Sequence, residues 1–195
     1  MISYVTHFID LRDKDFFTVP KPQEDELLSS WLVRVALAHD TLPWTFMNLH
    51  FPEYHNLPFS RDLDVWAPDD MLVKLAKKSG YTYEQIYSLT LRSYIGTVLP
   101  QFNPSCGNVY FSYIKVRGRS NQSFGQKFCS RCLEDDLVPY FRREWRLKAI
   151  DECQKHQIPL LDRCEHCAKP ISLYKFSREG QGYMVCWYCG KKFLV

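Results

Sequence analysis

Four short ligand pairs in the last third of the chain restrict its fold more than any other feature. Seven of the eight cysteines lie in this part, and two residues separate the members of every pair. The pairs are Cys129 with Cys132, Cys153 with His156, Cys164 with Cys167, and Cys186 with Cys189. A gap of two residues lets a tight turn aim both side chains at one point, which makes half of a tetrahedral zinc site. The spacing therefore predicts two complete metal sites.

Pairing the half-sites in chain order predicts two structural zinc ions, one on the first two pairs and one on the last two. Thiolate and imidazole ligands suit zinc better than calcium or magnesium, and four protein ligands leave no position for a catalytic water. An interleaved arrangement, in which the first and third pairs share one ion, uses the same ligands and is the alternative. His166 is the main rival ligand, and we interpret it as a loop histidine.

Other uses of cysteine fit the sequence less well. A disulfide scaffold needs an oxidising compartment, whereas residues 1–10 lack the basic start, the apolar core and the cleavage site of a signal peptide. Cysteine pairs so close together are more typical of metal binding than of thiol redox chemistry. Iron–sulfur binding is a further alternative. Cys106 is left over as a lone thiol. We therefore expect a reducing cytoplasm and, because no apolar run is long enough for a bilayer, no membrane contact.

Charge is divided unevenly along the chain. Residues 1–70 hold 5 Lys and Arg against 12 Asp and Glu, whereas residues 71–195 hold 20 against 10. This asymmetry indicates that a polyanion or an acidic protein meets the second half. The predicted nucleic-acid contacts are Lys115, Arg117, Arg119, Lys127, Arg131, Arg142, Arg143 and Arg146. The alternative for the dense run over 115–131 is a solvated loop that leads into the first zinc turn.

The N-terminal part has the pattern of a small helical domain. Apolar residues recur at helical spacing over 24–38, and Trp31 is the expected core anchor of this helix. Thr41 is the expected cap of a second helix, which stops near Pro52. Residues 52–68 hold three prolines and are predicted to form a connecting loop.

Two further helices follow this loop. Asp69 or Asp70 is the expected cap of the third helix, which Gly80 ends, and residues 82–85 have the form of a capping box that opens the fourth. Helix, glycine turn and helix together resemble the outline of a helix-turn-helix, which would insert residues 83–92 into DNA. The alternative is that this helix pair serves only as scaffold.

These patterns predict a mainly α protein with small zinc-ribbon β elements. An N-terminal helical, helix-turn-helix-like domain with an extended arm is expected over 1–105, a basic connecting segment over 106–127, and tandem zinc-binding motifs over 128–195. Within the last region, the acids 134–136 are expected to start a short helix. A second helix is expected over 142–152, with Trp145 inward and its arginines outward.

The motifs resemble the TniQ family of transposon target-selection proteins. The resemblance covers Phe128-Cys-Ser-Arg-Cys, Tyr140-Phe-Arg-Arg-Glu-Trp and the later ligand pairs, and it extends to Pro22, Glu26-Leu27, Ser30-Trp31-Leu32 and Arg34 near the N-terminus. Ser130 departs from the proline common in the family, and Gln157 from the glycine that often follows the histidine. Neither departure removes a zinc ligand.

The resemblance implies a bacterial, non-enzymatic adaptor. Family members link a target-recognising component to the AAA+ ATPase regulator of a transposon and contact nucleic acid. Because the chain ends soon after Cys189, we expect the short form of CRISPR-associated transposons, in which an RNA-guided effector chooses the target and DNA and guide RNA are nearby. A fragment of a longer, TnsD-like protein is the alternative.

Two other functions compete with the adaptor. A self-sufficient, sequence-specific DNA reader would need the fourth helix to present side chains such as Gln85 and Arg92 to base edges. An enzyme would need a catalytic motif, and the sequence has no P-loop, GxSxG or HExxH pattern. We therefore predict that the chain is not an enzyme.

Overall fold

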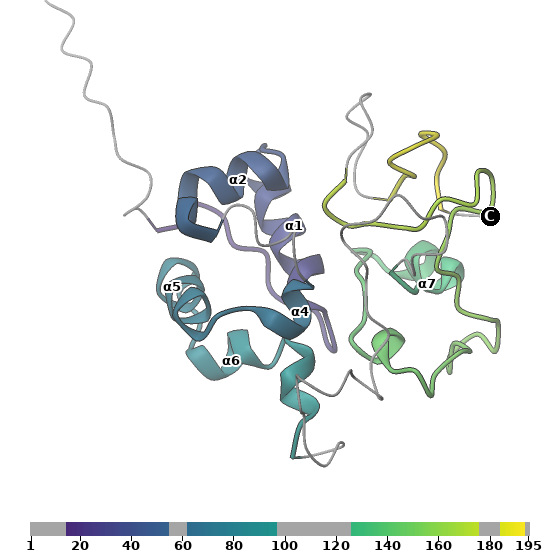
Figure 1. The fold of residues 1–195 in the computed structure, drawn as a ribbon, viewed down its shortest axis with the longest axis horizontal. Helices are drawn as coiled ribbons and strands as arrows, with labels where there is room; N and C mark the ends of the chain where they lie inside the picture. The colour runs from purple at the N-terminus through teal and green to yellow at the C-terminus, as the bar shows by residue number, and fades with distance from the viewer. Residues whose placement is uncertain (1–14, 55–61, 97–125, 176–183, 194–195) are drawn as a thin grey trace, which may run out of the picture.

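The computed structural model describes residues 15–54, 62–96, 126–175 and 184–193. Figure 1 shows helices on one side of the molecule and irregular, looped chain around α7 on the other. The described β structure consists of isolated bridges rather than strands. The prediction of a mainly helical protein with small β elements is confirmed. None of the described helices is long and apolar enough to cross a bilayer.

The helices are short in both halves. Among the described residues, those of the first half are α1 (Leu28–Ala38), α2 (Pro43–His50), α4 (Leu63–Trp66), α5 (Asp69–Ser79) and α6 (Tyr83–Tyr87), with 3-10 turns η2 (Pro52–Tyr54) and η3 (Leu91–Tyr94). Those of the second half are α7 (Ser130–Asp135) and the 3-10 turn η5 (Glu144–Arg146).

Local signals set the boundary between α5 and α6. Gly80 ends α5 with a φ of 76°, a left-handed conformation that costs glycine little. Thr82 accepts a hydrogen bond from the Gln85 amide, and the Gln85 side chain accepts one from the Thr82 amide. The predicted capping box is thus confirmed, although α6 ends only five residues after it begins.

Other predicted boundaries are wrong. Helix α1 begins at Leu28 rather than Glu24 because Asp25 has a left-handed φ of 56°. Thr41 does not cap α2, since its hydroxyl donates to the Ala36 carbonyl. Asp69 and Asp70 lie in the first turn of α5, after Pro68 at the cap position.

The predicted loop over 52–68 contains η2 and α4. In the second half, the helix expected over 142–152 is reduced to η5, and the acids 134–136 end α7 instead of starting a helix.

Helix α1 lies between two hydrophobic clusters and is buried on all sides over 28–36. Leu28, Trp31 and Leu32 pack in the first cluster, with apolar residues of α2, α4, α5 and α6. Leu27 and Val33 pack in the second, together with Phe141 and Trp145 and the cysteines of the second half. The predicted helical and zinc-binding regions therefore share a core.

Backbone contacts add to this shared core. The Leu27 amide donates to the Phe141 carbonyl at 2.9 Å, and the Arg143 amide donates to the Asp25 carbonyl at 2.7 Å. The Asp25 carboxylate accepts a further bond from the Glu144 amide at 2.9 Å. The left-handed turn at Asp25 thus places its carbonyl and carboxylate against the chain that leads to η5.

A buried ion-pair network crosses the same boundary. Arg146 is fully buried, and it contacts Asp62 and, at 3.0 Å, Asp64. Asp64 also accepts hydrogen bonds from the amide and the hydroxyl of Ser29, both at 2.8 Å. Burial raises the pKa of Asp64 to about 6, and the Arg146 guanidinium opposes this rise. The prediction that Arg146 faces outward is wrong, because two buried carboxylates hold its guanidinium in the interior.

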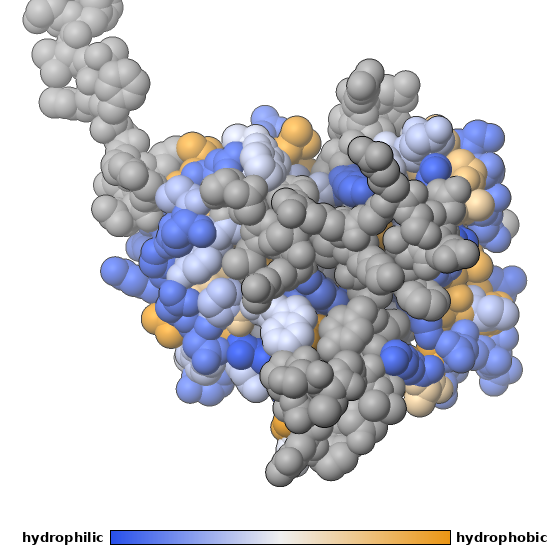
Figure 2. All heavy atoms as spheres, in the orientation of Figure 1, coloured by the Kyte–Doolittle hydropathy of each residue, from blue (hydrophilic) through white to orange (hydrophobic). Residues whose placement is uncertain are grey.

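Hydrophilic residues cover most of the described surface on the face drawn in Figure 2, with hydrophobic residues scattered between them. Among the residues that the structure describes, Leu137 is the most exposed large hydrophobic residue, at 99%. Single exposed apolar residues are ordinary on a protein surface.

Replacing Arg146 should destabilise the protein strongly. Arg146→Met leaves two buried carboxylates without a cation, and we expect the free energy of unfolding to fall by about 3–5 kcal/mol in urea titrations. Arg92→Ala, which breaks a pair with the exposed Asp69, should cost no more than about 1 kcal/mol. Adding Asp62→Asn and Asp64→Asn to Arg146→Met should restore part of the loss. Equal costs for Arg146→Met and Arg92→Ala would contradict the interpretation.

Candidate metal centres

The structure gathers the eight predicted ligands into two clusters, in chain order. The first contains Cys129, Cys132, Cys153 and His156, and the second contains Cys164, Cys167, Cys186 and Cys189. Within each cluster the donor atoms lie within 4.8 Å of one another. The described residues thus form the consecutive arrangement rather than the interleaved one. His166 is exposed and belongs to neither cluster, and Cys106 lies outside the described residues.

The spacing within the clusters fits a tetrahedral zinc ion. Zinc–sulfur bonds of about 2.3 Å at tetrahedral angles place two sulfurs about 3.8 Å apart. The Sγ atoms of Cys132 and Cys153 are 3.5 Å apart, and those of Cys164 and Cys189 are 3.7 Å apart. The His156 Nδ1 atom lies 3.4 Å from the Cys129 sulfur. Each cluster can therefore hold a metal ion in a closed shell, and three or four thiolates favour zinc.

Three of the four half-sites share one backbone turn. In the turn of Cys153, the Gln157 amide donates to the Cys153 carbonyl and the Cys153 amide donates to the Ile158 carbonyl. The turns of Cys164 and Cys186 repeat these two bonds, and an isolated antiparallel bridge flanks each of the three turns.

The residue after the second ligand has a positive φ in all three turns. It is Gln157 at 53°, Ala168 at 55° and Gly190 at 71°. A left-handed conformation favours glycine, which explains physically why glycine suits the position that Gln157 occupies here.

The remaining half-site is built on a helix. Cys129 is the N-cap residue of α7, and its sulfur accepts a hydrogen bond from the Cys132 amide at 3.4 Å. An antiparallel bridge between Phe128 and Leu161 places this half-site beside the later chain. The first site therefore combines a helix start with a turn, whereas the second combines two turns.

Asp135 orients the histidine of the first site. Its carboxylate lies 2.9 Å from His156 Nε2, while Nδ1 faces the sulfurs. A carboxylate on one ring nitrogen fixes the tautomer that leaves the other nitrogen free for metal. Lys155 and His156 lower the pKa of Asp135 below its ordinary value. Sequence reasoning treated Asp135 as a helix-start charge, because its partner His156 lies 21 residues away and no short pattern links the two.

The surroundings of the sulfurs raise the pKa of some of these cysteines and lower that of others. Burial raises the pKa of Cys129 and Cys132, and it raises the pKa of Cys167 to about 12. For Cys153 and Cys189, burial is outweighed by hydrogen bonds from backbone amides and neighbouring sulfurs, and the pKa is lowered. A bound divalent cation would stabilise the thiolates that these buried positions otherwise penalise.

The predicted nucleic-acid contacts lie in different environments. Lys115, Arg117 and Arg119 lie outside the described residues, and Arg146 is buried as described above. Arg131 is exposed. The other three predicted contacts form ion pairs: Lys127 with Asp151, Arg142 with Asp136, and Arg143 with Asp25.

The side chains proposed for base reading are also engaged within the chain. The Gln85 side chain accepts the capping bond from Thr82. Arg92 lies in η3, beyond α6, where it pairs with Asp69 at 2.8 Å and lies over the Tyr87 ring. A base-reading role would have to compete with these contacts.

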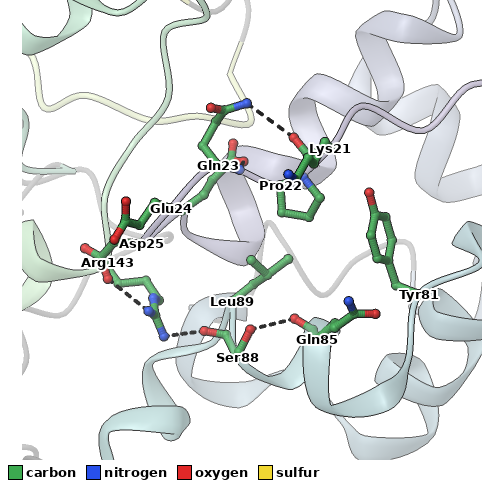
Figure 3. Close-up of a pocket in the computed structure, with 11 residues that line it drawn as sticks. Lys21, Pro22, Gln23, Glu24, Asp25, Tyr81, Gln85, Ser88, Leu89 and Arg143 are labelled. Carbon is green, nitrogen blue, oxygen red and sulfur yellow. Dashed lines mark hydrogen bonds and ion pairs between the residues drawn. The ribbon is translucent and has the colours of Figure 1, made fainter.

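A pocket of about 270 Å³ lies between the N-terminal arm, here residues 21–26, and α6 (Figure 3). Arg143 lies at its edge and joins Asp25 to the Ser88 carbonyl, so both halves of the chain contribute to the pocket. Its lining consists of Lys21, Pro22, Gln23, Glu24, Asp25, Glu26, Tyr81, Gln85, Ser88, Leu89 and Arg143. The lining thus mixes apolar and charged groups.

Loss of a ligand should remove one ion and unfold its surroundings. In Cys153→Ser we expect elemental analysis to find one zinc ion per chain instead of two. Because a structural zinc site contributes on the order of 10 kcal/mol to folding, the second half should lose its cooperative unfolding transition. His166→Ala, which changes an exposed histidine beside the second site, should retain both ions. Two ions and normal melting in Cys153→Ser would contradict the first site.

Asp135→Asn should weaken the first site without removing a ligand. Loss of the carboxylate partner of His156 is expected to lower zinc affinity about 10- to 100-fold, measured by competition with a chromogenic chelator. Glu134→Gln makes the same charge change on the same helix and should leave the affinity unchanged. Equal affinities in the two variants would show that Asp135 does not orient the histidine.

Comparison with known proteins agrees with the motifs. The family model described as TniQ matches residues 17–160, which include helices α1 to α7 and the complete first metal site. No curated protein matches the chain. Because the match covers more than half of the chain, the resemblance drawn from the motifs is confirmed. The chain therefore belongs to the TniQ family and is a transposition-associated protein.

Proposed function

We propose that this protein is a non-catalytic adaptor in transposon target selection. It links a target-recognition complex, an RNA-guided CRISPR effector in our proposal, to the AAA+ ATPase regulator of the transposon. The observation that carries the proposal is the shared core, which makes one body of the helical half and the first metal site. A scaffold of this kind can hold two partners at a fixed relative position.

Two further observations support an adaptor. Both candidate metal shells have four protein ligands, which suits a structural ion better than a catalytic one. The N-terminal arm places the acidic Glu24 and Asp25 on the wall of a pocket to which both halves contribute. We propose that this pocket and arm receive a protein partner, while the basic groups of the second half contact DNA or guide RNA.

A pull-down with the ATPase encoded beside this protein tests the partner half of the proposal. The purified full chain should retain the ATPase, and Glu24→Lys, at the pocket, should weaken retention by reversing an exposed charge. Glu84→Lys makes the same change on α6 outside the pocket lining and should bind as the unchanged chain does. Absence of ATPase binding by the unchanged chain would contradict the proposed adaptor function.

The alternative function is a self-sufficient, sequence-specific DNA-binding protein. Competition between random and candidate-site duplexes distinguishes the two, because an adaptor should show salt-dependent binding without sequence preference. A preference that disappears in Gln85→Ala or Arg92→Ala would favour the alternative.

A further inference from the structure

The second candidate metal site differs from the first in the charged residues around it. Near the first site, Lys155 pairs with Asp135, Lys127 with Asp151, and Arg142 with Asp136. Around the second site, the exposed Lys175, Lys191 and Lys192 form no ion pair with any residue that the structure describes.

These lysines give the second site a positive surface. A zinc ion with four thiolates carries a formal charge of −2, and Glu165 is the nearby acid in the described turns. Lys169, on the same surface, brings the lysines to four. Their charge exceeds the combined negative charge of the shell and Glu165, so they do more than neutralise a tetrathiolate site.

Two aromatic residues lie among the lysines, between the ligands Cys186 and Cys189. Tyr188 is 62% exposed, and its ring centroid is 5.7 Å from that of Trp187 at an interplanar angle of 80°. The indole nitrogen of Trp187 donates to the Pro170 carbonyl at 3.0 Å, which fixes this ring against the preceding turn. The tyrosine ring therefore projects from a rigid base.

Lysine ammonium groups lie directly over both rings. Lys169 Nζ is 5.2 Å from the Tyr188 centroid, and Lys175 Nζ is 4.4 Å from the Trp187 centroid. Cations beside an exposed ring form the combination that single-stranded nucleic acid uses, in which bases stack on the aromatic face and phosphates contact the lysines. A duplex keeps its bases stacked inside and cannot use the ring in this way.

We propose that the second metal site, through Tyr188 and Lys169, Lys175, Lys191 and Lys192, binds single-stranded nucleic acid. This surface contains none of the basic residues that the sequence nominated. The inference rests on the proposed function in one respect: it names the surface and the form of nucleic acid for the nucleic-acid contact that this function includes. Direct binding to an oligonucleotide tests it, whereas retention of the ATPase tests the adaptor.

The experiment uses fluorescence anisotropy of the zinc-loaded full chain with labelled oligouridine and oligothymidine of about 20 nucleotides. Tyr188→Ala should weaken binding roughly tenfold, and Tyr188→Phe, which keeps the ring, should bind as the unchanged chain does. A duplex of equal length should lose little affinity in Tyr188→Ala. Preference for oligouridine over oligothymidine would identify RNA as the ligand, and equal affinity would identify single strands of either kind.

Lysine variants test the electrostatic contribution to binding of the single strand. Lys191→Ala with Lys192→Ala should weaken binding and reduce the slope of log affinity against log salt by about 1.4, since each single-strand phosphate contact contributes about 0.7. Lys74→Ala with Lys77→Ala makes the same charge change on α5 and should leave the slope unchanged.

Three outcomes would overturn the proposal. They are equal losses in the two lysine pairs, no loss of single-strand affinity in Tyr188→Ala with zinc retained, and equal competition by polyglutamate, which would indicate an acidic protein ligand. If Tyr188→Ala loses zinc, the lysine pair and Tyr188→Phe still decide the question.

Discussion

The convergence of eight sulfur and nitrogen donors at two points is the constraint on which the second half of this protein depends. Its described residues contain one short helix, one 3-10 turn and isolated bridges, so hydrogen-bonded secondary structure contributes little to its stability. The donor clusters take the place of a longer helix or a sheet as the source of stability in this half. Burial raises the pKa of Cys129 and Cys132, so a bound cation would stabilise their thiolate form and would couple folding of this half to metal binding.

Attachment to the helical half comes from a second, independent set of contacts. The left-handed turn at Asp25 receives the chain before η5, and Arg146 places a guanidinium between Asp62 and Asp64. Buried ion pairs of this kind contribute little net stability but strongly penalise the loss of one partner. They therefore fix how the two halves fit together, and the proposed adaptor function would require such a fixed arrangement.

The distribution of charge differs between the two candidate metal sites. Lys155, Lys127 and Arg142 near the first site are paired with acids, whereas Lys169 and Lys175 near the second lie over the rings of Tyr188 and Trp187. Charge along the sequence indicated a basic second half but not which cations are available to a ligand. Pairing depends on residues far apart in the chain, as Arg143 with Asp25 shows.

The sequence by itself determined the features that depend on a few consecutive residues. Two-residue gaps identified all eight candidate ligands, Gly80 and the capping box of Thr82 and Gln85 set the boundary between α5 and α6, and motif order indicated the family. Only the tertiary structure decided the rest. Arg146 looked like an exposed helix residue, but its carboxylate partners lie 82 and 84 residues away. Asp135 could be assigned to His156 only once α7 and the turn of Cys153 had been brought together. Local spacing fixes where side chains can meet within a turn, whereas burial and pairing depend on contacts between segments that no short pattern encodes.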